Sequence, residues 1–440
     1  MSCLVRRGLA VAPFKVGPDF IDPGHHLRIT GKTSRNLDGW MLSNTYNLKC
    51  FKKSTEKADI AVVEGVMGLF DGYDGKSEAG STAQMAKWLG LPVILVVNAK
   101  SMARSAAALV QGFERFDKDL RFAGILFNNI GSKRHLKYLK EALTDNVNMP
   151  CLGGIPHDNE ISIPERHLGL VTRQDHPLSD EFKNRLADTI EKDIDVKALL
   201  DLYSNLESIK KIDSGPALKP AEDIRIGVAR DNAFCFYYQD NLDMLEESGA
   251  ELVSFLPVKD NKLPENLHGI YLGGGYPELY AGQLSSRTHF RKQIKEKSNE
   301  GMPIYGECGG FMYLCKEICD TNGKIYSMTG CFPFTTSMFT KLRSLGYRKI
   351  LMVKDTVIGK TGCKIRGHEY HYSELKKTLK GIESVYEVFD GSGKKKETEG
   401  YQVNQTLWSY NHLHFGSRPE AASCFVESCR NYKRECINET

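Results

Sequence analysis

Long apolar runs are missing from this chain of 440 residues. No stretch approaches the roughly 20 consecutive apolar residues that a membrane-spanning helix needs. Residues 1–8 also lack the uninterrupted apolar core of a secretory signal peptide. We therefore expect neither a membrane protein nor an exported one, and we expect a cytoplasmic location.

A surplus of charge is missing as well. The 59 Lys and Arg residues nearly balance the 55 Asp and Glu residues, so the formal net charge is +4. Proteins that bind nucleic acids or acidic membranes through phosphate groups need a stronger basic surplus. We expect neither nucleic acid nor a membrane as a partner. The basic run at residues 394–396 follows Gly-Ser-Gly and indicates an exposed hairpin loop.

Cysteines are present, but the spacing typical of metal sites is missing. The chain has 12 cysteines, and none of them forms a C-x-x-C pair. This argues against a zinc ribbon or an iron–sulfur site. Reduced and mostly buried thiols are the expectation for most of these cysteines.

One cysteine stands in a distinctive setting. Residues 303–307 form a short, mostly apolar run that ends at Cys308, and Gly309-Gly310 then opens a helical pattern. A sharp strand-to-helix turn needs small neighbours, and the helix N-terminus favours a thiolate and a developing oxyanion. We expect Cys308 to be a catalytic nucleophile in such a turn.

A base and an oxyanion site are available elsewhere in the chain. His412 and His414 follow a strand-like stretch, and either one can take the proton of the thiol. Residues 269–272 form another apolar strand, which runs into three glycines whose N–H groups can face an oxyanion. The predicted acyl-transfer site consists of Cys308, His412 or His414, Gly274, Gly275 and Gly309.

The first part of the chain alternates strands and helices. The predicted strands cover residues 10–16, 59–64, 92–97 and 122–128, and predicted helices between them cover 82–89 and 103–113. This pattern predicts a parallel α/β sheet, in which ligands bind beyond the carboxyl ends of the strands. The polar residues near those ends are Lys15, Asp19, Asp22, Glu64, Asp71, Asn98 and Asn128.

Several of these side chains suit phosphate chemistry. A carboxylate at the end of a strand, such as Glu64, holds Mg²⁺ directly or through water in phosphate-handling sheets. Lys15 is placed to contact a phosphate, and Asp19 to hold metal or to position a substrate carboxylate. We therefore expect Asp19 and Glu64 as metal ligands and Lys15 as a nucleotide contact.

Two α/β domains are expected. The polar stretch at 201–223 contains Ser-Gly-Pro and Lys-Pro and is predicted to be a linker. A new strand is predicted at 224–229, followed by a helix at 238–248 and a strand at 251–255. The predicted domains are thus residues 1–200 and 224–440.

The motifs of the second domain resemble the class I glutamine amidotransferase domain. In that domain a cysteine in a G-x-C-x-G turn hydrolyses glutamine to glutamate and ammonia. The order of the GGG, GECGG and HLHF motifs carries the resemblance, and it favours His412 over His414. Many members have an acid two residues after the histidine, where this chain has His414. Either a dyad operates or an acid comes from elsewhere, Glu369 being one candidate.

Further motifs resemble the cobyrinate a,c-diamide synthase family over nearly the whole chain. They are FKVGPDFIDP, SRNLDGWM, EGVMGLFDG, GSTA, SMARSAAALVQGF, PERHLGL and RGHEYHYS. That family joins an ATP-binding domain of the dethiobiotin synthetase type to a glutaminase domain, and it amidates the a and c acetate groups of a corrin precursor. The resemblance implies cobyrinate, L-glutamine and ATP as substrates and Mg²⁺ as a cofactor. It also implies that Asn128 contacts adenine and that Asp19, Glu64 and Asp71 serve metal, phosphate and carboxylate chemistry.

A Walker-type motif, G-x-x-x-x-G-K-[ST], does not occur in these residues. The family begins with a strand and such a loop, and residues 4–9 resemble the end of the helix that follows the loop. We therefore expect roughly 25 residues to be missing at the start, through a misplaced initiation codon or a deletion. Binding of the β- and γ-phosphates of ATP is expected to be weakened.

The leading hypothesis is a carbon–nitrogen ligase of cobalamin biosynthesis that uses glutamine and ATP. Amidation of nickel-sirohydrochlorin or of hydrogenobyrinate is an alternative with the same motifs, and a glutaminase-only or inactive product is another. A partition-type nucleotide switch is disfavoured by the glutaminase signature. The oligomeric state is open, with a homodimer as one expectation.

Overall fold

The computed structural model describes residues 1–163, 178–204, 224–376, 382–396 and 398–438. The chain falls into two compact units, Met1–Gly39 with Asn44–Ser214 and Trp40–Ser43 with Gly215–Thr440. Most of the predicted linker and the whole PERHLGL motif, at residues 164–170, lie outside the described residues. None of the described helices is long and apolar enough to cross a membrane.

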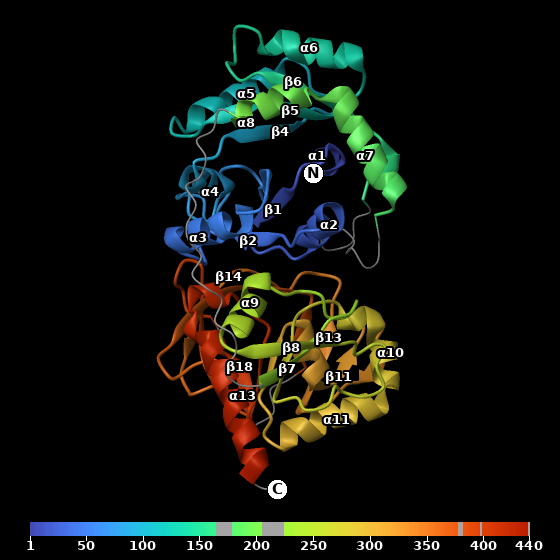
Figure 1. Ribbon diagram of the computed structural model, residues 1–440, viewed down its shortest axis with the longest axis vertical. Helices are drawn as coiled ribbons and strands as arrows, with labels where there is room; N and C mark the ends of the chain where they lie inside the picture. Colours follow the sequence, from blue (N-terminus) through green and yellow to red (C-terminus); the bar gives the residue numbers. More distant parts are fainter. Residues whose placement is uncertain (164–177, 205–223, 377–381, 397, 439–440) are drawn as a thin grey trace. The chain divides into compact units, whose positions relative to one another are not determined.

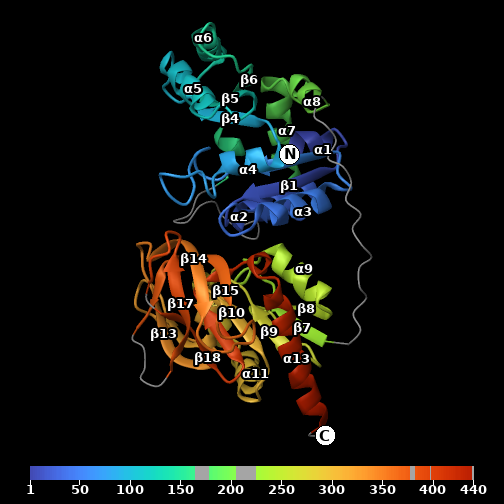
Figure 2. The ribbon, with the colours of Figure 1, turned by 90° about the vertical axis from the view of Figure 1, so that its left-hand side faces the viewer.

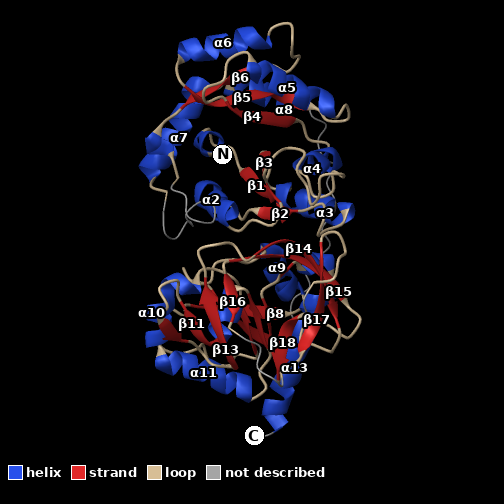
Figure 3. Cartoon of the chain, turned by 180° about the vertical axis from the view of Figure 1, so that it is seen from behind, coloured by secondary structure: helices blue, strands red, loops and turns tan. Residues whose placement is uncertain are grey.

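The first unit contains two parallel sheets, each of 3 strands (Figure 3). Their strand orders are β2-β1-β3 and β4-β5-β6. All residues of β1 are buried, as expected for a parallel strand that is covered on both faces. The strands are β1 (Val11–Val16), β2 (Arg35–Leu37), β3 (Ile60–Glu64), β4 (Val93–Asn98), β5 (Phe122–Ile130) and β6 (Cys151–Pro156).

Helices connect these strands, and α5 and α6 pack against each other (Figure 1). The local sequence determines where helix α4 begins and ends. At its N-terminus the Ser81 side chain accepts a hydrogen bond from the Gln84 N–H, and at its C-terminus Gly90 takes a left-handed conformation with φ 65°. The helices are α1 (Ser2–Arg6), α2 (Ile21–Thr30), α3 (Asn44–Thr55), α4 (Thr82–Leu89), α5 (Ser105–Phe116), α6 (Lys133–Leu143), the 3₁₀ helix η1 (Asn159–Ile161), α7 (Asp180–Asp193) and α8 (Val196–Ser204).

The second unit is built on a sheet of 10 strands in the order β20-β15-β14-β17-β18-β19-β10-β9-β7-β8. The pairs that involve β7, β8, β9 and β10 are parallel, and the remainder of the sheet is antiparallel. The strands are β7 (Ile224–Ala229), β8 (Ala250–Phe255), β9 (Gly269–Leu272), β10 (Ile304–Glu307), β14 (Ser344–Met352), β15 (Lys364–His371), β17 (Ser384–Asp390), β18 (Glu399–Val403), β19 (Thr406–Ser409) and β20 (His412–Leu413).

A smaller sheet of 4 strands, in the order β12-β11-β13-β16, and a set of helices complete this unit. The long helix α13 packs beside β7 and α9 (Figure 2). The strands are β11 (Cys315–Cys319), β12 (Ile325–Ser327), β13 (Phe332–Met338) and β16 (Ser373–Leu375). The helices are α9 (Gln239–Glu247), η2 (Pro277–Tyr280), α10 (Ala281–Ser286), α11 (Thr288–Asn299), α12 (Gly309–Leu314), η3 (Phe415–Ser417) and α13 (Glu420–Asn438).

The predicted elements are confirmed with small shifts at their ends, and α4 and β7 match the predicted ranges. The expected hairpin loop is also present, because β17 and β18 form an antiparallel pair around residues 394–396. The expected parallel pairing is confirmed, and in the first unit it is divided between two sheets. Among the described residues, β3 pairs with β1 alone and β4 with β5 alone, so no ladder of hydrogen bonds joins the two sheets.

Candidate active site

Cys308 occupies the predicted turn between a strand and a helix. Strand β10 ends immediately before it, α12 begins immediately after it, and its backbone has φ 46° and ψ −100°. A positive φ is costly for a residue with a side chain and marks stored backbone strain. The Cys308 N–H donates to the Ser409 carbonyl at 2.8 Å, which ties the turn to the end of β19. The turn is confirmed, and the catalytic role remains a prediction.

The predicted glycines pack around this turn. A Cβ on Gly309 would lie 2.9 Å from the Gly275 nitrogen, so only glycine allows the helix to approach the end of β9 this closely. A Cβ on Gly274 would lie 2.3 Å from Cε1 of His412. The Gly310 N–H also donates to the Gly273 carbonyl at 2.9 Å. The structure thus brings Gly274, Gly275, Gly309 and His412 together at one end of the parallel strands.

His412 is buried beside the ring of His368, with ring centroids 4.8 Å apart and 14° between the planes. Burial, together with the charge of His371, lowers the pKa of His412 to about 3, against the opposing effect of Glu369. Burial and the charge of Glu278 raise the pKa of the Cys308 thiol well above its usual range. The resting pair is therefore a neutral thiol and a neutral imidazole, which can accept a proton.

His414 is engaged in a structural role. Its Nδ1 accepts a hydrogen bond from the Gly416 N–H at 3.1 Å, which caps η3, and its Nε2 lies 3.9 Å from Asp240 Oδ2. Its ring also packs on Tyr238, with centroids 4.4 Å apart. These contacts support the choice of His412 as the predicted base.

Glu369, the candidate acid from the sequence, is held by other groups. Arg348 Nε lies 2.6 Å from one of its oxygens and His371 Nε2 lies 2.7 Å from the other. Although burial raises its pKa, the contacts with His371 and Arg348 outweigh burial and lower the pKa of Glu369 to about 2. The carboxylate that approaches His412 is instead Glu307, whose Oε2 lies 3.9 Å from His412 Nδ1.

The sequence interpretation missed two acids near the site, the buried Glu307 and the partly buried Glu399. Glu307 accepts hydrogen bonds from the Tyr305 hydroxyl, the Tyr271 hydroxyl and the Leu413 N–H, at 2.5, 3.1 and 3.0 Å. Glu399 accepts one from the Tyr410 N–H at 2.5 Å and others from the side chains of Ser409 and Asn411, at 2.5 and 2.6 Å. For Glu307 the signal available was an acid at the end of an otherwise apolar strand, which is unusual unless the acid has partners. Glu399 begins β18 after a polar stretch, so the local sequence carried no such signal.

In the first unit Lys15 lies at the end of β1 among carboxylates. Its Nζ lies 2.5 Å from Asp22, 3.6 Å from Asp19 and 3.5 Å from Glu64, and it donates to the Gly65 carbonyl at 3.2 Å. Burial lowers its pKa, but the three carboxylates outweigh burial, so the net shift is upward and the side chain remains an ammonium. The structure thus brings together Lys15, Asp19 and Glu64, as the strand-end pattern predicted.

Burial and the neighbouring charge of Asp22 raise the pKa of Asp19 to about 6. Asp22 shifts the other way: burial opposes its ionisation, but the contact with Lys15 outweighs burial and lowers its pKa. Glu64 is 45% exposed and lies 2.6 Å from Nε2 of His26. The cluster therefore offers carboxylate oxygens toward solvent at the carboxyl end of the sheet.

Asp71 and Asn128 lie on other segments. Asp71 accepts a hydrogen bond from the Gly68 N–H at 3.0 Å and closes the turn after β3. Asn128 lies on β5, in the separate second sheet, and its side chain accepts a hydrogen bond from the Asn129 N–H at 2.9 Å. No hydrogen bond or ion pair among the described residues joins either side chain to the Lys15 cluster.

The donor atoms of the cluster suit Mg²⁺, because Mg²⁺ prefers carboxylate oxygens and is usually held by one or two carboxylates together with water and substrate phosphates. Asp19 and Glu64 present such oxygens 3.6 and 3.5 Å from the Lys15 ammonium. Within the part of the chain that the structure describes, no group of three or more acidic, His or Cys side chains is arranged to enclose a metal ion by itself. The residues therefore fit a metal that arrives with the nucleotide.

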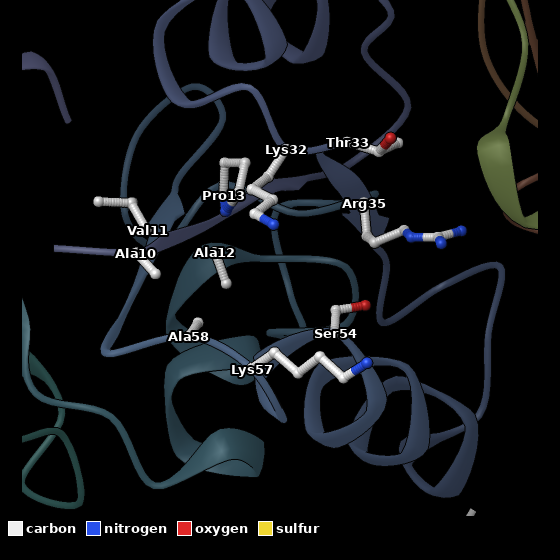
Figure 4. Close-up of a pocket in the computed structure, with 10 residues that line it drawn as sticks. All are labelled: Ala10, Val11, Ala12, Pro13, Lys32, Thr33, Arg35, Ser54, Lys57 and Ala58. Atoms are coloured by element: carbon white, nitrogen blue, oxygen red, sulfur yellow. The ribbon is translucent and has the colours of Figure 1, made fainter. Parts of the chain in front are cut away.

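A separate pocket lies at the opposite end of β1 (Figure 4). Its lining includes residues 10–13 with Lys32 and Arg35 on one side and Ser54 and Lys57 on the other. None of the predicted site residues belongs to this lining. The carboxyl-end cluster around Lys15 is therefore the better candidate for the reaction site of this unit.

Comparison with known proteins identifies the type of domain in each part of the chain. Residues 225–420 match the CobB/CobQ-like glutamine amidotransferase domain, and residues 1–171 match the CobQ/CobB/MinD/ParA nucleotide binding domain. The chain is therefore a glutamine amidotransferase domain preceded by a nucleotide-binding domain.

Relatives define the family more narrowly. The chain is 44% identical over 431 residues to a protein of Syntrophotalea carbinolica named cobyrinate a,c-diamide synthase, covering 98% of this chain and 94% of that relative. It is 42% identical over 460 residues to the protein of that name in Methanosarcina barkeri, with 98% and 92% covered. It is 41% identical over 420 residues to the protein of that name in Listeria innocua, covering 95% of this chain and 92% of that relative. The chain belongs to the cobyrinate a,c-diamide synthase family of glutamine-dependent amidating ligases.

Proposed function

We propose that this protein amidates the a and c acetate carboxylates of cobyrinate, using ATP and the ammonia released from glutamine. The observation that carries the proposal is the strained Cys308 turn, which packs against Gly275 while the adjacent Gly274 meets the His412 ring, in a chain that also holds a nucleotide-binding domain. Membership of a family whose members bear the name cobyrinate a,c-diamide synthase supports the same substrate.

In the glutaminase half, His412 takes the proton of the Cys308 thiol, and the thiolate attacks the carboxamide carbon of glutamine. The tetrahedral oxyanion faces the N–H groups at Gly275 and Gly309. The proton returns to the leaving nitrogen, ammonia departs, and a thioester remains. Water activated by His412 then releases glutamate and restores the thiol.

In the synthetase half, a substrate carboxylate attacks the γ-phosphate of ATP, and ADP leaves. Ammonia then displaces phosphate from the acyl phosphate to form the amide. Lys15 is placed to neutralise phosphate charge, while Asp19 and Glu64 would hold Mg²⁺, which supplies further charge neutralisation at the phosphates when bound. Asp71 and Asn128 are assigned to nucleotide or carboxylate contacts by family resemblance, and Asn128 would contact the adenine.

Nickel-sirohydrochlorin and hydrogenobyrinate are less favoured as substrates, because the relatives above are all named for cobyrinate. A glutaminase without synthetase activity is a distinct outcome of the test below. The reaction is proposed to take place in the cytoplasm.

The test is to incubate the purified protein with glutamine, Mg-ATP and cobyrinate and to measure glutamate, ADP and amidated tetrapyrrole. Cys308→Ser is expected to abolish glutamate release, and amidation is expected to continue when ammonium is supplied, because the nucleotide cluster lies in the other unit. Loss of ammonia-dependent amidation in a folded Cys308→Ser protein would contradict the scheme of two separate sites. Glutamate release without any amidation would leave only the glutaminase.

A further inference from the structure

A buried acid, Glu307, lies next to both Cys308 in the sequence and His412 in the structure. Glu307 precedes Cys308 on β10, and its register partner on β19 is Ser409, just upstream of His412. Its Oε1 accepts the hydrogen bond of the Leu413 N–H at 3.0 Å, so this carboxylate holds the backbone next to His412 as well as facing the ring. Glu307 is only 1% exposed, so solvent does not compete for its oxygens.

We propose that Glu307 is the positioning carboxylate of the glutaminase site, which selects the His412 tautomer that carries its proton on Nδ1. The inference rests on the proposed glutaminase function. The contact of 3.9 Å between Glu307 Oε2 and His412 Nδ1 lies within ion-pair range but is longer than a hydrogen bond. Contacts of this kind in substrate-free sites often tighten when substrate binds.

The tautomer decides whether His412 can act as a base. An acceptor oxygen facing Nδ1 favours the Nδ1–H form, and the proton-accepting lone pair is then on Nε2. Gly274 leaves room for the edge of the ring at Cε1, so the ring is confined by backbone on one side and by Glu307 at Nδ1. The Nε2 atom is thus the one that can accept the thiol proton.

The hydrogen bonds of Glu307 fix its orientation. The Tyr305 hydroxyl and the Leu413 N–H both donate to Oε1, while the Tyr271 hydroxyl donates to Oε2, the oxygen that faces His412. Burial raises the pKa of Glu307 to about 7, against the lowering effect of these donors. Near and above neutral pH a substantial fraction of the group is therefore a carboxylate with its second oxygen turned to the imidazole.

The substitution Glu307→Gln tests whether the carboxylate positions His412, because glutamine keeps the size of the side chain and removes its charge. The amide can keep its oxygen at the Oε1 position for Tyr305 and Leu413, but its NH₂ group replaces Oε2 and faces Nδ1 with a donor. The imidazole is then expected to move its proton to Nε2, where it blocks the acceptance of the thiol proton. We expect kcat for glutamine hydrolysis to fall by about 100- to 10,000-fold with little change in KM. Glu296→Gln is the control, because it makes the same acid-to-amide change at a side chain on α11 that is 51% exposed, and we expect kcat to stay unchanged.

The decisive measurement is nitrogen-15 NMR of the histidine side chains, with the His412 signals assigned by their loss in His412→Gln. We expect the Nδ1–H tautomer in the unmodified protein and the Nε2–H tautomer in Glu307→Gln. An Nε2–H tautomer in the unmodified protein, or an unchanged kcat in Glu307→Gln, would overturn the inference. The tautomer can be read without turnover and does not depend on Glu307→Gln folding, so an inactive unmodified protein would count against the proposed function and leave this test standing.

Discussion

At the scale of single residues, two of the acids around Lys15, Asp19 and Glu64, are the predicted metal ligands. Asp19→Asn and Glu64→Gln remove one carboxylate each from the predicted Mg²⁺ and phosphate site. A lost charge-assisted contact of about 1.5–3 kcal/mol predicts a fall in ATP-dependent amidation of about 10- to 150-fold. Glutamate release should stay unchanged. Separate assays of ADP and glutamate check this, with Glu56→Gln, an exposed acid, as the control; synthetase rates equal to those of the unmodified protein would refute the assignment.

A second prediction at this scale concerns Glu399. Burial and the charge of Glu369 raise its pKa to about 7, against the donors that surround it. Because the folded pKa lies above the unfolded value of about 4.5, ionisation destabilises the folded protein as the pH rises between these values, and the cost is complete above pH 7. Glu399→Gln cannot ionise, so its free energy of unfolding relative to the unmodified protein should rise by about 2.5 kcal/mol between pH 5 and pH 8. Urea unfolding at several pH values measures the difference, and a flat difference would show that Glu399 is already ionised in the folded protein at pH 5.

At the scale of elements, the backbone after β9 approaches His412 on β20 so closely that there is no room for a side chain at Gly274. Gly274→Ala would place a Cβ 2.3 Å from the His412 ring and is expected to displace it, lowering glutamate release at least about 100-fold while the sheet stays folded. Gly282→Ala in α10 is the matched control, because its Cβ would meet only Tyr326 at 3.7 Å, an ordinary contact. Thermal unfolding of both variants distinguishes displacement from misfolding. Full activity in Gly274→Ala would mean that His412 is not the base.

Local patterns predicted the elements that carry these residues, but not their partners. The apolar run and the glycines around Cys308 predict a strand, a turn and a helix within about a dozen residues. Glu307 and Glu399 reach the segment 409–413 only through the order and register of β10, β18 and β19. Those pairings join segments far apart in the chain, and a single sequence does not reveal them. For the same reason Glu369 was a reasonable candidate acid until its pairing with Arg348 and His371 became visible.

At the scale of the whole molecule, the separation of the two sheets in the first unit affects solubility. Within the described residues, β3 and β4 each have an edge with no strand partner, and Val96 on β4 is 61% exposed. Such edges promote association between molecules. Val96→Lys is expected to lower the aggregated fraction severalfold in light scattering, without changing glutamate release. Leu345→Lys is the control, because Leu345 is 64% exposed but lies on β14, where it pairs with Tyr370 of β15 inside the sheet of 10 strands. Equal effects of the two variants would show that general surface hydrophobicity is responsible.

The strain at Cys308 also determines how the enzyme fails on heating. The Cys308 and Gly310 N–H groups are bonded to carbonyls at the ends of β19 and β9, on either side of β10. A local movement therefore cannot bring Cys308 to a negative, unstrained φ. Such a change would first have to break the hydrogen bonds that tie the turn to the ends of β19 and β9. Local openings elsewhere, at loops and termini, leave the nucleophile in place. Thermal loss of the glutaminase should accordingly coincide with cooperative melting of the second unit, and recovery on cooling should be limited by re-forming that sheet.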